Sequence, residues 1–249
     1  MKRLNVQTMV LELTRQCNLE CKHCFRGDSR NEYMNTKIID LVFKNSCRIN
    51  SLLLTGGEPL LAVEQLKRIR DNILKDKTNV GEILVVTNGT ILTNEIIQIL
   101  KDIETRTRVD IRLSTDAFHL IEIKDKGLLE TKSNNIKTLK RLFNVDISYP
   151  KVFVIDRVGK AVNLTEEDMD YVNKLDNTKY VIGNSKILEE YRKQYPLPIL
   201  KPDNVVDGTL NIDVHGNITP TYYSYEAEDK HSYSNINKGL TLAINDIKL

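Results

Sequence analysis

Three cysteines lie within eight residues of one another, in the order Cys17-Asn-Leu-Glu-Cys21-Lys-His-Cys24. Thiolates this close can bind adjacent irons of one cubane cluster, because the loop can wrap around it. Four cysteines are the rule for electron-carrying [4Fe–4S] centres, so a set of three leaves one iron open for chemistry. The spacing favours an iron–sulfur centre over two alternatives. One is a zinc site that includes His23, although structural zinc sites usually add a distant ligand pair; the other is a thioredoxin-like cysteine pair.

Other short polar or glycine-containing motifs follow predicted strands. The cysteines follow a β-branched, apolar stretch at residues 6–14. Similar strands at 51–55, 82–87 and 109–114 are followed by Gly56-Gly57-Glu58-Pro59, Asn88-Gly89 and Ser114-Thr115-Asp116. The carboxyl ends of parallel strands meet at one edge of a sheet, where ligand sites form. We therefore expect these motifs to converge on one site.

The elements that position these motifs alternate between strands and helices. Apolar residues at helical spacing predict helices at 36–43, 61–76, 96–103 and 136–143, and residues 152–155 supply a fifth strand. This alternation predicts crossover units and a parallel sheet. Five units by about residue 156 are too few for a closed eight-stranded barrel but suit an open or partial one.

The pattern weakens after about residue 157. We predict a capped helix start at 165–168, a short strand at 180–182 and a β-hairpin at 210–219 that turns at His215-Gly216-Asn217. Pro196, Pro198 and Pro202 mark an irregular connection. We predict one core region at residues 1–160 and a second region at 161–249 that ends the fold and adds a C-terminal appendage.

Composition limits the classes of partner. Lys and Arg number 36 against 34 Asp and Glu, so the net charge of +2 disfavours a nucleic-acid-binding role. No apolar run approaches the roughly 20 residues that span a bilayer, and the N-terminus lacks the features of a secretory signal. We therefore expect no membrane partner and a cytoplasmic location, where thiols stay reduced. The fourth cysteine, Cys47, is predicted to be a small buried residue on a helix.

Taken in order, these motifs resemble those of the radical S-adenosylmethionine (radical SAM) enzymes. The resemblance rests on Cys-x3-Cys-x2-Cys, then Thr55-Gly56-Gly57-Glu58-Pro59-Leu60, Thr-Asn-Gly and Ser-x-Asp, and it covers residues 6–160. It implies a partial (β/α)6 barrel that binds a [4Fe–4S] cluster and S-adenosylmethionine (SAM). An electron from a reductant such as flavodoxin or ferredoxin would cleave SAM to methionine and a 5′-deoxyadenosyl radical, which abstracts hydrogen from a substrate.

The resemblance also implies roles for individual residues. Cys17, Cys21 and Cys24 would bind three irons, and SAM would chelate the fourth. Glu58 and the backbone of Gly56 and Gly57 would receive the amino group of SAM, and Pro59 would fix the turn. Further SAM contacts are implied for Asn88, Ser114, Asp116 and Gly159, with Phe25 and His23 walling the cluster and adenine. His119 is the candidate catalytic acid or base, and a structural histidine is the alternative.

The C-terminal region resembles a reduced SPASM or twitch extension, placing the chain near the MoaA and SPASM branch. Thr221 stands where such an extension has a cysteine, and no cysteine follows Cys47, so several cysteine ligands for an auxiliary cluster are absent. Tyr222, Tyr223 and Tyr225 could line the substrate site, although aromatic packing is the favoured explanation.

Several functions remain open at this point. A peptide substrate fits the SPASM-like remnant, and a viperin-like enzyme acting on a small molecule or nucleotide fits the compact length. A glycyl-radical activating enzyme ranks third. A non-catalytic iron–sulfur or zinc-binding regulator is the alternative from a different class, and the intact Gly-Gly-Glu-Pro segment argues against it.

Overall fold

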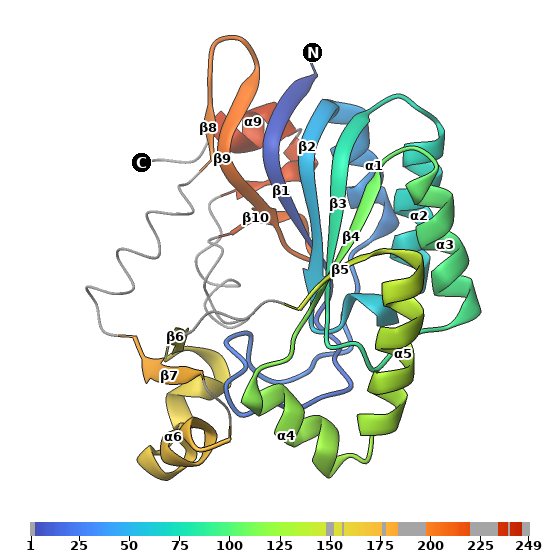
Figure 1. Cartoon of the computed structure of the whole chain (residues 1–249). Coiled ribbons are helices and arrows are strands. Elements are labelled where there is room, and N and C mark those ends of the chain that lie inside the picture. The colour runs from blue at the N-terminus through green and yellow to red at the C-terminus, as the bar shows by residue number, and fades with distance from the viewer. Residues whose placement is uncertain are drawn as a thin grey trace.

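The computed structural model describes residues 3–147, 152–155, 157–175, 178–183, 198–219, 234–238 and 240–245. Its centre is a parallel sheet of β1 (Leu4–Thr14), β2 (Ser46–Gly56), β3 (Asn79–Thr87), β4 (Arg108–Leu113) and β5 (Asn144–Asp146), adjacent in that order. Figure 1 shows α1 (Thr36–Asn45), α2 (Val63–Leu74), α3 (Asn94–Glu104) and α5 (Leu129–Leu142) together on one side of this sheet. The predicted α/β class and parallel sheet are confirmed. The described strands do not close into a barrel.

The C-terminal part of the chain extends the same sheet. Strand β9 (Val205–Ile212) pairs in parallel with β1, so β1 has a neighbour on both sides. The short strands β8 (Ile199–Leu200), β10 (Asn217–Ile218) and β11 (Ser234–Asn235) complete the edge, followed by turn η3 (Ile236–Lys238) and helix α9 (Leu240–Asn245). The predicted hairpin is present, because β9 and β10 pair antiparallel. The boundary at residue 160 stays a prediction.

A second, two-stranded sheet lies apart from the first. It pairs β6 (Val152–Ile155) in parallel with β7 (Lys179–Ile182), next to turn η2 (Gly159–Asn163) and helix α6 (Glu166–Asn173). The capped start of α6 was predicted, and its Thr165 and Asp168 form a reciprocal capping box. The strand at 152–155 was also predicted, but the fifth strand of the main sheet is instead the short β5.

The core lies between the main sheet and its helices. Strand β1 supplies Leu11 and Leu13, and β2 supplies Leu52 and Leu54, all fully buried, with Leu11 opposite Leu54 in the register. Burial of such side chains contributes about 1.5–3 kcal/mol each. The long β1 is therefore a rigid base for the loop that leaves its carboxyl end.

The prediction that Cys47 lies on a helix is wrong. Cys47 is the second residue of β2, is only partly buried, and lies with its Sγ 2.8 Å from Asn5 Oδ1 of β1. The apolar run that predicts this strand begins at residue 51, while backbone pairing with β1 extends the strand back to Ser46.

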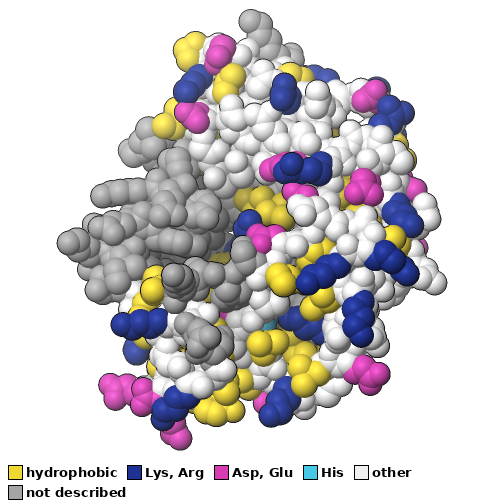
Figure 2. Space-filling view, in the orientation of Figure 1, with side chains coloured by type: hydrophobic (Ala, Val, Ile, Leu, Met, Phe, Trp, Pro, Cys, Tyr) yellow, Lys and Arg dark blue, Asp and Glu magenta, His cyan; other side chains and the backbone are white. Residues whose placement is uncertain are grey.

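The distribution of charged side chains on the surface agrees with the near-zero net charge of the chain. Figure 2 shows Lys and Arg interspersed with Asp and Glu over the described part of one face, with no continuous basic stripe there. Within the described residues, no helix has the length and apolar character needed to cross a membrane. Residues 220–233, which include Thr221 and the three neighbouring tyrosines, lie outside the described part of the chain.

Candidate active site

A cavity of about 350 Å³ opens at the carboxyl ends of the parallel strands. The blue loop after β1 lies beneath these strand ends in Figure 1, on the side of α4 (Ala117–Asp125) and α6. Two separate strand ends contribute polar wall residues, namely Asn88 after β3 and Ser114 and Asp116 after β4, and the loop contributes Cys17, Cys21 and Cys24. The expected convergence of the motifs is therefore observed for these six residues.

The end of β2 holds the beginning of the cysteine loop. The backbone N–H of Gly57 donates to Thr14 O, and that of Glu58 donates to Gln16 O, each at 2.8 Å. A Cβ on Gly57 would lie 2.3 Å from Gln16 O, closer than real Cβ atoms come to any neighbour. Glycine is thus required here because two stretches of backbone touch. The Gly56-Gly57 segment also lines the cavity.

The three cysteines are free thiols in a largely apolar setting. Cys21 is buried, Cys17 and Cys24 are partly buried, and Leu19 and Ile123 pack beside them. Burial raises the pKa of Cys17 to about 12 and raises the pKa of Cys21 still further. Such thiols stay protonated at neutral pH until a metal centre displaces the proton. Three thiols from one loop on one cavity are a donor set that fits an iron–sulfur cluster.

Hydrogen bonds outside the cysteines hold this loop in shape. The hydroxyl of Ser29 accepts from Cys17 N at 2.9 Å and donates to Cys17 O at 3.1 Å. The carboxylate of Glu122, on α4, accepts from the backbone N–H of Glu20 at 3.0 Å. From the other side, the N–H of Lys160 donates to Cys24 O at 2.9 Å. Each cysteine therefore has a loop segment fixed close to it.

Glu58 is a fully buried carboxylate that joins the ends of two strands. Its oxygens accept from Thr87 Oγ1 at 2.7 Å, Asn88 N at 2.8 Å and Leu60 N at 3.1 Å. Burial raises the pKa of Glu58 to about 7, although these three donors oppose the shift. The side chain is not part of the cavity wall. Pro59, also buried, begins the 3₁₀ turn η1 (Pro59–Leu61), consistent with its expected place in the turn.

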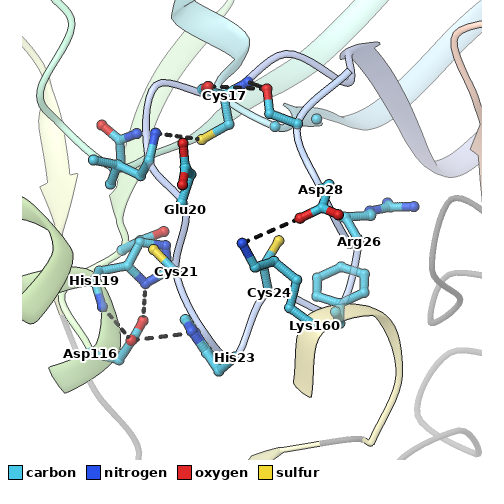
Figure 3. Close-up of a pocket in the computed structure, with 18 of the residues that line it drawn as sticks. Cys17, Glu20, Cys21, His23, Cys24, Arg26, Asp28, Asp116, His119 and Lys160 are labelled. Carbon is cyan, nitrogen blue, oxygen red and sulfur yellow. Dashed lines mark hydrogen bonds and ion pairs between the residues drawn. The ribbon is translucent and has the colours of Figure 1, made fainter. Parts of the chain in front are cut away.

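Asp116 is the charged centre of the part of the wall formed between β4 and α4. It caps α4 by accepting from His119 N at 3.0 Å, and its carboxylate pairs with His119 Nδ1 and, at 3.4 Å, with His23 Nε2. Burial alone would raise the pKa of Asp116, but the two imidazoles hold it well below its usual range. Figure 3 shows both histidines pointing at this carboxylate. His119 and His23 both line the cavity.

The remaining predicted contacts differ in exposure. The ring of His23 stacks on Phe118 with centroids 4.6 Å apart, whereas Phe25 lines the cavity and is 38% exposed. Gly159 is not itself a wall residue. It lies directly against the backbone of Cys24 and Phe25, between Val158 and Lys160, which are wall residues. The ligand roles of all these residues stay predictions.

Two features of the site were missed at the level of sequence. Arg15 lines the cavity although it is fully buried, and it pairs with Glu12 at 3.4 Å, Glu32 at 3.4 Å and Asp213 at 3.5 Å. A glutamate inside the apolar strand at 6–14 was the available signal, because a buried charge needs a partner. Lys132 of α5 is also buried and donates to Ser114 O at 2.7 Å, and burial lowers its pKa to about 8. Its neighbours in sequence are polar, so nothing marked it.

Comparison with known proteins adds a family match and several relatives. A family model described as the radical SAM superfamily matches residues 11–155. An uncharacterized protein of Methanocaldococcus jannaschii is 24% identical over 96% of this chain and 81% of its own length. A probable GTP 3′,8-cyclase of the same organism is 33% identical over 76% of this chain and 63% of its own length. The chain therefore spans less than two thirds of that cyclase.

Two solved structures share the fold at low identity. The structure of anSMEcpe with bound AdoMet and a Cp18Cys peptide matches with a TM-score of 0.56, covering 96% of this chain and 80% of that one. The structure of Streptococcus suis SuiB bound to precursor peptide SuiA matches with a TM-score of 0.52, covering 93% and 62%. Both are 14% identical to this chain, so the likeness shows the fold alone.

Proposed function

This chain belongs to the radical SAM superfamily, and we propose that it cleaves SAM at a cluster bound by Cys17, Cys21 and Cys24 to abstract hydrogen from a peptide. Members of this family are enzymes that use a [4Fe–4S] cluster and SAM. The observation that carries the proposal is the presence of all three thiols on the wall of one cavity at the strand ends.

The bound cluster and SAM would supply the chemistry, namely one-electron cleavage of a C–S bond to give a 5′-deoxyadenosyl radical. An external one-electron donor such as flavodoxin or ferredoxin would provide the electron. The part played by this chain is to bind, orient and exclude water. The apolar packing of Leu19 and Ile123 around the thiols supports water exclusion.

The strand ends that line the cavity offer polar groups for SAM. The backbone of Gly56 and Gly57 can approach a ligand closely, and Ser114, Asn88 and Asp116 present polar side chains to the same cavity. Because Glu58 is fully engaged with the ends of the strands, we assign it the support of this part of the wall, with any ligand contact made through its neighbours' backbone. His119, held at Nδ1 by Asp116, would hold or move a proton at Nε2.

The charge of the cavity favours a peptide over a nucleotide triphosphate. Among the described residues, each lysine or arginine of the wall already has a carboxylate partner. Arg15 pairs with Glu12 and Asp213, Arg26 with Glu12 at 3.6 Å, and Lys160 with Asp28 at 3.3 Å. A polyphosphate site needs cations available to its oxygens. Apolar wall residues such as Phe153 and Val154 instead suit an uncharged side chain.

A nucleotide substrate is the second candidate, because five GTP 3′,8-cyclases or probable GTP 3′,8-cyclases are among the relatives at 25–33% identity. Their names apply to longer proteins, of which this chain spans 61–63%.

We also propose that residues 161–249 form a reduced SPASM-like region beside the core.

The test is SAM cleavage by the anaerobically reconstituted full chain. With dithionite and SAM we expect 5′-deoxyadenosine by mass spectrometry, and we expect Cys21→Ala to lose both the cluster and the product. Addition of GTP should leave the rate unchanged, whereas peptides encoded beside the gene should raise it. Stimulation by GTP would favour the nucleotide candidate, and no product from a protein with an intact cluster and a peptide present would contradict the proposal.

A further inference from the structure

A second group of metal-ligating side chains lies beside the three cysteines. Cys21, His23 and His119 each offer one ligand atom, and these atoms lie within 4.8 Å of one another. All three residues line the cavity. Among the described residues, neither Cys17 nor Cys24 belongs to this group. The group therefore differs from the set of thiols proposed to hold the cluster, and shares only Cys21 with it.

Asp116 orients both histidines of this group. Its Oδ2 pairs with the Nδ1 of His119, and its Oδ1 lies 3.4 Å from the Nε2 of His23. Each imidazole thus keeps its other nitrogen for a further partner. Histidines that bind metals in proteins commonly have one nitrogen held by a carboxylate in this way, which fixes the ring and strengthens the other nitrogen as a donor. A single carboxylate here does this for two rings.

The unused nitrogen of His23 points to a missing partner. Its Nδ1 is buried and has no hydrogen-bond partner among the described residues, and only 10% of the side chain is exposed. A buried polar atom without a partner destabilises the folded state. The ring is fixed on its other sides by stacking on Phe118 and by the edge of His119, whose centroid is 5.0 Å away. Coordination of a cation would give this nitrogen the partner that it lacks.

We propose that the iron-free protein binds one zinc ion through Cys21, His23 and His119, with Asp116 as the supporting carboxylate. Mixed sulfur and imidazole donors are those that zinc prefers, and three protein ligands leave a fourth position for water. Binding displaces the thiol proton of Cys21 into solution. On the proposed function Cys21 also binds iron, so zinc and the cluster exclude each other. Zinc bound here blocks cluster assembly.

The experiment uses the full chain, purified anaerobically and freed of metal. Zinc affinity is measured by competition with a chromophoric chelator, and Co²⁺ is used as an optical probe for thiolate and imidazole ligands. We expect one zinc ion per chain. His119→Ala should weaken binding on the order of 100-fold, and Asp116→Asn by about 10- to 100-fold. Asparagine can still cap α4, so the second variant keeps the fold, and circular dichroism checks both.

Cysteine variants decide between this site and a zinc site made by the three clustered thiols. Cys17→Ala and Cys24→Ala should retain zinc affinity within about twofold of Cys47→Ala, the control with a thiol changed on β2. Zinc binding lost equally in Cys17→Ala and Cys21→Ala, or unaffected by His119→Ala, would overturn the proposal. Cys17→Ala also separates the two proposals, since it should lose the cluster and 5′-deoxyadenosine formation but keep zinc.

Discussion

Replacement of Gly159 by alanine tests whether turn η2 is packed against the cysteine loop. A Cβ at this position would lie 2.3 Å from Phe25 O and 2.6 Å from Cys24 O, both backbone atoms that no rotamer change can move. Gly127 is the matched control, because its φ of +67° is close to the +57° of Gly159 and its Cβ would meet nothing within 4 Å.

Both variants lose stability because alanine is placed in the left-handed region, and only Gly159→Ala also introduces a steric clash. Alanine in the left-handed region costs about 1–2 kcal/mol in either place. Overpacking against the loop adds about 1–3 kcal/mol for Gly159→Ala alone. If η2 moves away from Cys24 to relieve the clash, we expect the overpacking energy to be lost from SAM binding instead, which weakens that binding by about 5- to 150-fold.

Two assays read this out: urea denaturation for the free energy of unfolding, and initial rates of 5′-deoxyadenosine formation for the KM of SAM. Gly127→Ala should lose some stability and keep the KM of the parent protein. Gly159→Ala should lose more stability, raise the KM, or both. Equal losses and equal KM values in the two variants would refute the close packing of η2 on the loop.

Three further predictions concern buried or loop-fixing carboxylates and their partners. Because burial raises the pKa of Glu58 from 4.5 to about 7, the folded state holds an extra proton between these values, and the free energy of unfolding should fall as pH rises from 5 to 7. Urea denaturation of Glu58→Gln should lack this fall. The same dependence of the free energy of unfolding on pH in the variant and the parent protein would contradict the prediction. Arg15→Leu leaves buried carboxylates unpaired and should cost about 3–5 kcal/mol in the same assay, against less than about 1 kcal/mol for the exposed Arg108→Leu. Glu122→Ala removes the acceptor of the backbone N–H of Glu20 and should speed iron loss to a chelator about fivefold, roughly 1 kcal/mol. The control Glu130→Ala, at an exposed position on α5, should leave this rate unchanged. Equal rates of iron loss in the two variants would show that the contact does not hold the loop.

Local patterns predicted the elements that pack on the main core. Burial stabilises these elements, and apolar spacing in the sequence indicates burial. This holds for the apolar runs of β1 and β3 and for the helical stripes of α2 and α3. The motifs at the strand ends were predicted to converge because parallel strands share a direction. Spacing alone therefore brought Cys17 and Ser114, 97 positions apart, into one predicted site.

What escaped prediction depends on contacts between distant parts of the chain. Strand β5 has three residues and exists through pairing with β4, so no apolar run marks it. Arg15 is held by Asp213, 198 positions away, which no local pattern records. Cys47 was misplaced because the start of β2 is set by its pairing with β1 rather than by its own residues.

The most direct test of the central assignment is electron paramagnetic resonance of the reduced, reconstituted protein with and without SAM. Three cysteine ligands leave one iron open, so addition of SAM should change the signal of the reduced cluster, and Cys17→Ala, Cys21→Ala and Cys24→Ala should each lack that cluster. A full cluster whose signal is the same with and without SAM, or a normal cluster in any of the three variants, would contradict the account.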